Sequence, residues 1–255
     1  MNIKKAVLMY FSPTGGTKKL ACLLGQRLGM EIEEMDITAG EPQRTFAPDE
    51  LAVFAFPCYG GRIPAPMHER MKGIKGSNTP ALLLCVFGNR AVDDAYLEMK
   101  DAAAENGFVS IAAAEFIAPH SVDRSYASDR PDASDLKIMD EFAAKFREKI
   151  AAAEAPKAIE LPGNRPYREY NGIPIKPGYK AKNCIHCGKC FAHCPTGAIN
   201  AAEPDKFDRD KCISCMGCVA VCPEGARYIP TAMKIAGKAF LKKACSDRKE
   251  PKYFL

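Results

Sequence analysis

Eight of the twelve cysteines in this sequence form one spacing pattern that is written twice. Each copy reads C-x2-C-x2-C-x3-C-P, and the second copy begins 28 residues after the first. Over residues 184–199 and 212–227 the two copies agree at nine of sixteen positions. This run of thiolates is typical of cubane iron–sulfur sites, because three closely spaced sulfurs surround one cluster. The sequence therefore predicts two 4Fe–4S clusters, whose chemistry is the transfer of single electrons.

The eight cysteines divide between the two predicted clusters in a crossed manner, since the fourth cysteine of each run ligates the other cluster. The first set is Cys184, Cys187, Cys190 and Cys222, and the second set is Cys212, Cys215, Cys218 and Cys194. A pair of zinc sites is the alternative, because zinc also uses C-x2-C. Triple-cysteine turns written twice favour clusters. Crossed ligation further predicts that residues 179–228 fold only with iron.

A second candidate site lies near the N-terminus, where a predicted strand ends in a turn that opens a helix. The turn holds Ser12, Thr14, Gly15, Gly16 and Thr17. Hydroxyl groups, glycines and a helix N-terminus favour a bound phosphate. The turn lacks the lysine of a nucleoside triphosphatase loop, which excludes that class.

Two further loops are candidates for holding an aromatic ring. One comprises Pro57, Tyr59, Gly60 and Gly61, and the other comprises Phe87, Gly88, Asn89 and Arg90. Tyr59 offers an aromatic face, and the glycines leave backbone groups open to a ring edge. Arg90 either forms an ion pair with Asp93 or Asp94 or places a positive charge beside the ring.

The elements that must position these loops follow from hydrophobic periodicity. Strands are expected at 3–11, 31–36, 51–56, 81–87 and 109–118, and helices at 16–28, 64–74, 93–105 and 134–153. Alternating strands and helices predict an α/β, doubly wound, five-stranded parallel sheet of order 2-1-3-4-5. In such a sheet the three loops meet at the carboxyl ends of the strands, where ligands bind.

Composition and motifs divide the whole chain into four segments. Residues 1–153 form the α/β domain, 154–178 a proline-rich linker, and 179–228 the cluster domain. Residues 229–255 form a basic tail, expected to be helical up to about Cys245. The formal charge of +5 does not indicate a nucleic-acid partner, because eight thiolates, two cubane cores and one phosphate bring it to about −1. No apolar run is long enough to span a membrane, and the N-terminus has no signal-peptide cleavage site, so a cytoplasmic protein is expected.

Residues 179–228 resemble a bacterial two-cluster ferredoxin, a small α+β fold. The three N-terminal loops together resemble the flavodoxin family, which implies that residues 1–153 are flavodoxin-like and bind FMN. The whole chain resembles the flavodoxin–ferredoxin fusion proteins of anaerobic bacteria and archaea. The sequence has no tryptophan, so the residue that covers the second face of a flavin ring is not predicted.

The expected function is electron transfer between FMN and the two 4Fe–4S clusters, coupling one-electron and two-electron redox partners in anaerobic-type metabolism. The expected partners are other redox proteins, and a homo-oligomer is left open. The alternative is a flavoenzyme that reduces a small-molecule acceptor at FMN with electrons supplied through the clusters. A redox sensor ranks third, because no DNA-binding helix pair or effector domain is evident. No G-x-G-x-x-G follows a strand, which disfavours direct use of NAD(P)H.

Overall fold

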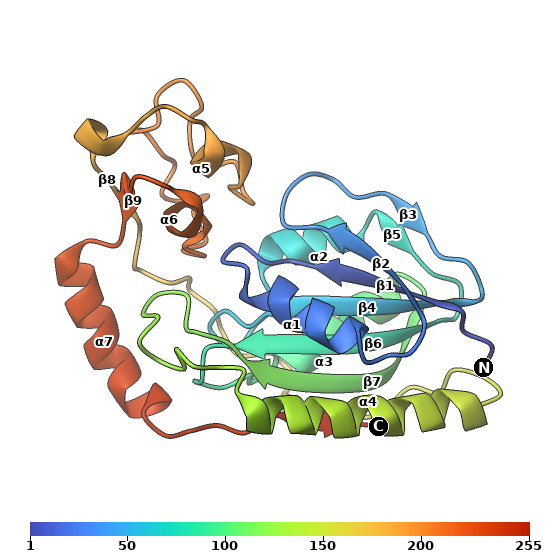
Figure 1. Cartoon of the computed structure of the whole chain (residues 1–255). Helices are drawn as coiled ribbons and strands as arrows, with labels where there is room; N and C mark the ends of the chain where they lie inside the picture. Colours follow the sequence, from blue (N-terminus) through green and yellow to red (C-terminus); the bar gives the residue numbers. More distant parts are fainter.

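The computed structural model describes all residues from 1 to 255, and its larger part is an α/β domain built on one twisted sheet (Figure 1). The sheet order is β10-β7-β6-β4-β1-β2. Its strands are β1 (Lys5–Tyr10), β2 (Glu31–Asp36), β4 (Glu50–Pro57), β6 (Thr79–Phe87), β7 (Phe108–Ile117) and β10 (Lys252–Phe254). The first five strands are parallel to one another. When these five are numbered 1 to 5 along the chain, their order across the sheet is 2-1-3-4-5, as predicted.

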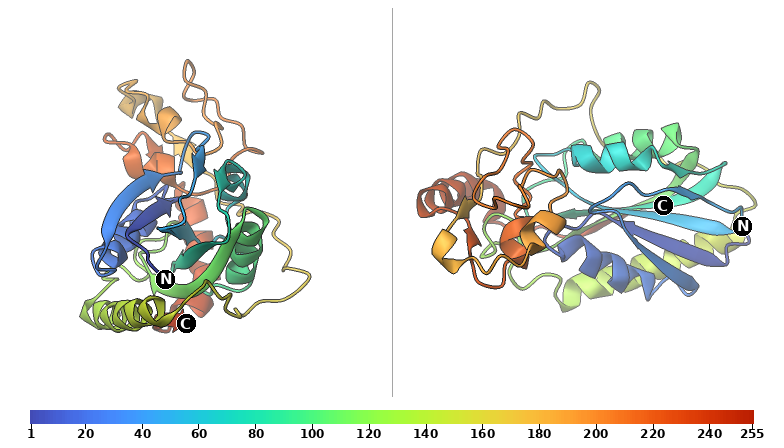
Figure 2. Two further views of the ribbon diagram at one scale, coloured as in Figure 1. Left: turned by 90° about the vertical axis from the view of Figure 1, so that its right-hand side faces the viewer. Right: turned by 90° about the horizontal axis from the view of Figure 1, so that it is seen from above.

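Helices cover both faces of the sheet, as a parallel sheet requires (Figure 2). They are α1 (Gly16–Gly25), α2 (Ala65–Met71), α3 (Ala95–Glu105) and α4 (Ala133–Ala152). Two hydrophobic cores result, one between the sheet and α1 and α4, the other between the sheet and α2 and α3. The central strands β4 and β6 are buried along their whole length, which explains their uninterrupted apolar sequences. A short pair, β3 (Arg44–Thr45) and β5 (Ile74–Lys75), lies outside the main sheet.

The sixth strand corrects the expectation of a five-stranded sheet and comes from the part of the tail beyond its predicted helix. Helix α7 (Thr231–Cys245) ends at the predicted residue, but the chain then returns to the sheet and pairs β10 antiparallel to β7. Strand alternation sends Tyr253 toward Phe142 on one face, with ring centroids 5.4 Å apart, and Phe254 toward Tyr96 on the other, at 5.6 Å. The C-terminus thereby closes an edge of the sheet that would otherwise expose unpaired backbone groups.

The proline-rich segment between α4 and the cysteine runs lies ordered against the α/β domain. Ile159 and Leu161 are buried in the core on the α3 side. Asp94, at the start of α3, accepts hydrogen bonds from the backbone N–H groups of Asn164 and Arg168 at 2.8 and 2.7 Å. These contacts fix the path of a segment that has no helix or strand before β8 (Gly178–Tyr179).

The cysteine-rich lobe is built from short elements around the two cysteine runs. They are β8, η1 (Ala181–Asn183), α5 (Lys189–Ala192), α6 (Gly217–Val221) and β9 (Arg227–Tyr228). In Figure 1 this lobe sits at the carboxyl end of the sheet, and α7 descends from it along the side of the molecule. None of the helices in the protein combines the length and hydropathy needed to cross a bilayer.

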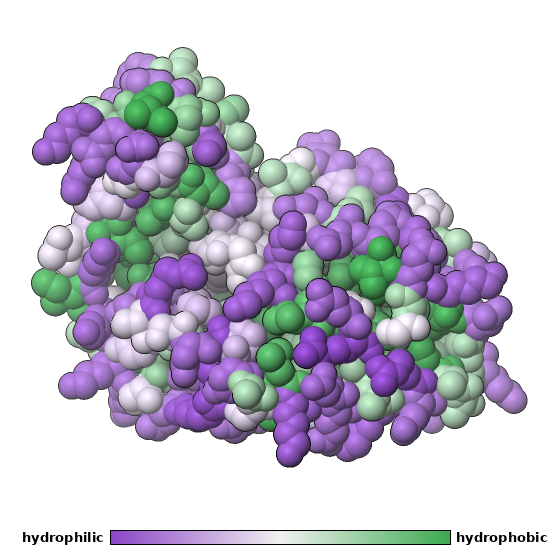
Figure 3. All heavy atoms as spheres, viewed as in Figure 1, coloured by the Kyte–Doolittle hydropathy of each residue, from purple (hydrophilic) through white to green (hydrophobic).

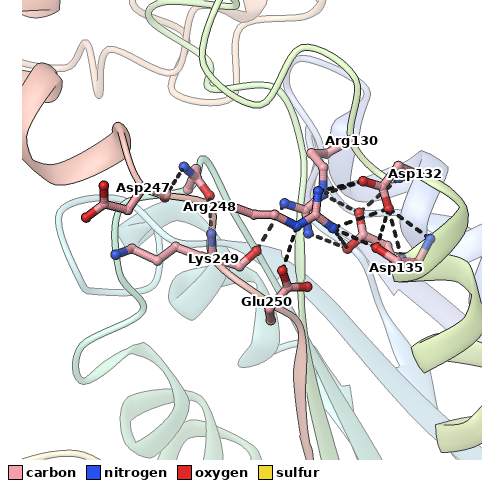
Figure 4. Close-up of polar contacts among 9 residues, drawn as sticks. Arg130, Asp132, Asp135, Asp247, Arg248, Lys249 and Glu250 are labelled. Carbon is pink, nitrogen blue, oxygen red and sulfur yellow. Dashed lines mark hydrogen bonds and ion pairs between the residues drawn. The ribbon is translucent and has the colours of Figure 1, made fainter.

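The tail is tied to the start of α4 by a network of charged groups (Figure 4). Asp132 caps α4 and exchanges backbone–side chain hydrogen bonds with Asp135. Arg130 forms a bidentate ion pair with Asp135, and both side chains are buried. Arg130 also donates to the carbonyl of Lys249 at 3.0 Å, and Arg248 donates to Asp132 at 2.7 Å. The end of the chain therefore depends on a buried charge pair.

Breaking this pair on one side is expected to destabilise the protein strongly. Arg130→Met leaves the carboxylate of Asp135 buried without its cation, which costs about 3–5 kcal/mol. Replacing both partners, Arg130→Met with Asp135→Leu, should cost clearly less, because no buried charge remains. Arg248→Ala, which removes a half-exposed partner, should cost about 1 kcal/mol or less. Denaturant unfolding followed by circular dichroism measures all three; equal losses in the single and double variants would contradict the account.

Candidate functional site

The predicted phosphate turn has the backbone geometry of an anion cradle. Gly15 has a positive φ of 83°, and a Cβ placed there would meet no atom within 4 Å, so the turn faces open space. Gly16 begins α1 and packs close to Ala118, where a Cβ would approach to 3.2 Å. The N-cap residue Gly15 has no side chain to cap α1, and Ser12 satisfies the N–H of Lys18, so the N–H groups of Gly16 and Thr17 are left available to an anion.

The hydroxyl residues of the turn differ in their roles. Ser12 is buried; its N–H donates to Thr38 Oγ1 at 2.8 Å, and its Oγ accepts from the N–H of Lys18 at 2.9 Å. Thr17 is also buried. Thr14 faces a cavity of about 860 Å³ between the turn, the 121–125 loop, the cysteine-rich lobe and α7. Ser12 therefore shapes the turn, and Thr14 is the hydroxyl group presented to the cavity.

A second cavity, of about 480 Å³, opens where the two predicted ring loops meet. The predicted residues that line it are Tyr59, Gly60, Phe87, Gly88 and Arg90. The two cavities share Ser121 and Val122 on the loop after β7, so they are neighbours along one groove. A planar ring at one end and a phosphate at the other fit this arrangement. Figure 3 shows hydrophobic residues on the concave surface between the lobe and the body of the molecule.

Three residues of the predicted ring loops lie elsewhere. Pro57 is the last residue of β4 and does not line the ring cavity. Gly61, with a φ of 89°, packs against Asp93 and Arg168. Asn89 is buried, and its side-chain NH₂ donates to the carbonyls of Cys245 and Asp247 at 2.8 and 3.0 Å. Asn89 thus fastens the C-terminal tail, a role that no local sequence signal reveals.

Arg90 lines the ring cavity and also forms an ion pair with Asp93, one of its two predicted alternatives. The other arginine near the ring loops, Arg62, forms a bidentate ion pair with Glu98 at 2.7 Å and does not line the cavity. His120 lines the cavity beside Gly88, and its Nδ1 accepts from the N–H of Val122 at 3.2 Å. Burial lowers the pKa of His120 to about 4, so its ring is neutral at pH 7.

Two walls of the ring cavity were not predicted from the sequence. The linker contributes residues 168–175, and its Tyr170 ring lies directly over Gly60, 2.5 Å from where a Cβ would stand. Helix α7 contributes Phe240 and Leu241. Tyr170 and Phe240 are therefore the aromatic residues available to cover a second ring face. Neither was predictable, because the linker has no periodicity and the tail is far away in sequence.

The cysteines form two groups in space. Cys184, Cys187, Cys190 and Cys222 line one cavity in the lobe. The charges of Cys194 and Cys212 act on both Cys215 and Cys218, so these four thiols are neighbours. Each group holds three cysteines of one run and the fourth of the other. No three metal-ligating side chains approach closely enough to hold a single metal ion. Four thiols in each group are a donor set that suits a cubane cluster.

The second cysteine group lies against the ring loop. Cys215 is buried in the same hydrophobic core as Tyr59; burial raises the pKa of the Tyr59 hydroxyl, and a thiolate at Cys215 would raise it further, so the two groups are near each other. His193 donates from Nε2 to the carbonyl of Pro13, in the phosphate turn, at 2.7 Å. Gly217, at the start of α6, approaches Pro13 so closely that a Cβ would lie 3.0 Å from its ring. The lobe is therefore packed onto both parts of the N-terminal site.

Comparisons with known proteins agree with this division of the chain. Residues 176–223 match the 4Fe–4S dicluster domain family. No match to a curated protein was found for the sequence. The N-terminal part is similar to solved structures of flavodoxins and of an azoreductase. An archaeal flavodoxin is 14% identical, with 58% of this chain and 99% of that chain covered and a TM-score of 0.41. A Megasphaera elsdenii flavodoxin is 15% identical, with 55% and 98% covered and a TM-score of 0.37.

A third similar structure is an azoreductase from Bacillus anthracis, 12% identical, with 58% of this chain and all of that chain covered and a TM-score of 0.38. Because these identities and TM-scores are low, the fold is established by the strand order of the sheet itself. The chain joins a flavodoxin-like α/β domain to a 4Fe–4S dicluster domain.

The partly buried imidazole of His120 predicts a pH dependence of stability. An unfolded histidine titrates near 6.5 and the folded one near 4, so the unfolded state binds more protons between these values. This part of the stability is present above pH 6.5 and is lost as the pH falls toward 4, by up to about 3 kcal/mol. His120→Asn, whose Oδ1 can still accept from Val122, should lose less free energy of unfolding between pH 7 and pH 4.5 than the wild type. Denaturant titrations at the two pH values measure this, and parallel losses in both proteins would refute it.

Proposed function

We propose that this protein relays electrons between FMN, bound at the carboxyl edge of the sheet, and two 4Fe–4S clusters in the cysteine-rich lobe. The observation that carries the proposal is the packing of Cys215 into the same core as Tyr59. A cysteine of the second cluster set and an aromatic residue of the ring cavity thus belong to one buried hydrophobic cluster. Such packing suits transfer within the molecule and supports a relay rather than two independent carriers.

The FMN site is proposed from the two neighbouring cavities. The turn from Ser12 to Thr17 would hold the phosphate through backbone N–H groups and the Thr14 hydroxyl. The ring would lie in the cavity lined by Tyr59, Phe87 and Tyr170. Its neutral His120 and the ion-paired Arg90 would fix the polarity of the ring's surroundings.

Helix α7 also contributes two lysine side chains to the cavity beside the phosphate turn. Lys234 and Lys238 of α7 line the same cavity as Thr14. Lys18, the first cation after the turn, is instead engaged with Glu34 at 3.8 Å and with the Tyr10 ring. Two lysines that are remote in sequence are therefore proposed to attract the phosphate dianion.

The cluster sites are proposed on the two spatial cysteine groups. Cys184, Cys187, Cys190 and Cys222 would hold one cluster, and Cys194, Cys212, Cys215 and Cys218 the other. When bound, the clusters exchange single electrons and FMN exchanges one or two, so the protein would couple one-electron and two-electron redox partners. Cys187 is the exposed member of the first group, which supports the first cluster as the one that would exchange electrons with an external redox protein.

A second candidate function is reduction of a small molecule at FMN with electrons from the clusters. The observation that favours it is the enclosure of the ring cavity by linker and α7, with the cations Arg90 and Arg168 in its wall. Multiple turnover of a small acceptor by the reduced protein would support this function. Stoichiometric exchange with redox proteins, without such turnover, would support the relay.

The relay is tested by pulsed photoreduction of the flavin in the anaerobically purified protein. Bleaching of the iron–sulfur absorbance should follow with a rate that does not depend on protein concentration. His193→Ala removes the hydrogen bond to Pro13 and should slow this internal step several-fold. His186→Ala alters an exposed histidine beside the first cysteine run and should leave the rate unchanged. A rate that rises in proportion to protein concentration would reject internal transfer.

The phosphate site is tested by comparing FMN with riboflavin, which lacks the phosphate. Lys234→Ala with Lys238→Ala should weaken FMN binding about tenfold and leave riboflavin binding nearly unchanged. Lys242→Ala with Lys243→Ala removes the same charge from the same helix, outside the cavity lining, and serves as the control. Quenching of flavin fluorescence measures each affinity. Equal effects on both flavins, or on both double variants, would rule out the proposed lysine contacts.

A further inference from the structure

A buried arginine breaks the symmetry of the cysteine repeat. Arg227 lies fifteen residues after Cys212, and its counterpart fifteen residues after Cys184 is Ile199. Both side chains are buried, at 1% and 4% exposure. The first repeat thus shows that this position suits an apolar residue, and the second repeat places a permanent cation there. A buried charge at such a position is costly unless something compensates it.

Nothing in the protein chain compensates this charge fully. One nitrogen, Nη2, donates to the carbonyl of Pro204, while Nε and Nη1 are buried without a hydrogen-bond partner. The guanidinium stacks over the Tyr179 ring, 5.0 Å from its centroid, and lies 5.9 Å from that of Phe207. Aromatic faces stabilise a cation only partly. Two nitrogens of Arg227, which carry three N–H donors, therefore remain to be satisfied by a group other than the protein.

Arg227 stands between the two cysteine groups. It lines the cavity of the first group and also the larger cavity beside α6. The first of these cavities is lined by all four cysteines of the first group. The second is lined by Met216, Val219 and Ala220, which stand on either side of Cys218 of the second group. One guanidinium thus borders both cysteine groups.

We propose that Arg227 is the shared counter-charge of the two clusters and raises both of their reduction potentials. The proposal rests on the proposed function, because it requires that the two cysteine groups hold clusters. A cubane core of charge +2 with four thiolates carries a net charge of about −2, and gaining one electron makes it about −3. A nearby cation in a low-dielectric setting stabilises the more negative state more strongly. The unpaired Nε and Nη1 groups are the donors available to cluster sulfurs.

The chain offers a matched pair of variants for this proposal. Arg227→Ile installs the residue of the first repeat and removes the charge, whereas Arg227→Lys keeps it. Arg209→Ile removes the same charge from an exposed side chain of the same lobe, which also contacts the Phe207 ring, 5.8 Å from its centroid. A purely structural arginine would influence iron retention but would not set the potentials.

The experiment is an EPR-monitored redox titration of the full-length protein, purified anaerobically, with iron content measured on the same samples. Arg227→Ile should lower the reduction equilibrium constants of both clusters at least tenfold, a shift of about 59 mV to more negative potential. Arg227→Lys should retain most of the wild-type potential, and Arg209→Ile should show no shift.

Each result decides the proposal. Full iron content with unchanged potentials in Arg227→Ile would overturn it. If Arg227→Ile loses iron, Arg227→Gln, which is polar and uncharged, is compared with Arg227→Lys. Iron retained by the lysine variant alone supports the need for a charge, while loss from both variants, or wild-type potentials in the glutamine variant, overturns it. A wild-type protein without 4Fe–4S signals would instead contradict the proposed function.

Discussion

The parallel direction of the five principal strands is the constraint on which the rest of this structure depends. Parallel strands bring all their carboxyl ends to one edge of the sheet, so the turn after β1 and the loops after β4, β6 and β7 must meet there. That edge is also where the cysteine-rich lobe packs, through Pro13 and Tyr59. The phosphate turn, the ring cavity and the second cysteine group therefore share one region because of strand direction, not because of proximity in sequence.

The C-terminal segment fixes the cysteine-rich lobe to the α/β domain. After leaving the lobe, the chain runs through α7 past both cavities and ends as β10 on the edge of the sheet. Asn89 and Arg130 hold the connection between α7 and β10 through backbone carbonyls. The lobe is thus attached to the α/β domain at both of its ends, by the linker and by the tail. Such double attachment limits how far the two cofactor sites can separate.

The buried charged residues of this protein lie where segments distant in sequence come together. Asp135 and Arg130 are buried together and orient the start of α4 toward the tail. Arg227 is buried without a carboxylate partner and lines both the cavity of the first cysteine group and the larger cavity beside α6. Buried charges are weak sources of net stability, since desolvation offsets most of their attraction. Their value here is that they specify one arrangement of segments that are distant in sequence.

Much of the fold was predictable, because its signals are local. Runs of apolar residues predicted the buried strands, and both ends of β2 were predicted at the residues where the structure has them. The observed ends of several helices differ from the predicted ends by one to three residues, because capping and tight turns determine where a helix ends. β10 was not predicted, since three residues carry no period of their own and acquire strand structure only by pairing with β7. The linker was likewise unpredictable in its path, which depends on Asp94 and on buried contacts of Ile159 and Leu161.

By itself, the sequence determined the chemistry that the chain carries: eight thiolates at cubane spacing, a glycine-containing turn before a helix, and a parallel α/β sheet behind it. These features depend on residue type and short spacing, which sequence displays directly. The tertiary structure alone decided that Tyr170 and α7 wall the ring cavity, that Asn89 holds the tail, and that Cys215 joins the hydrophobic core that contains Tyr59. Such pairings join residues 110 to 160 positions apart, and they form only when packing brings whole segments together.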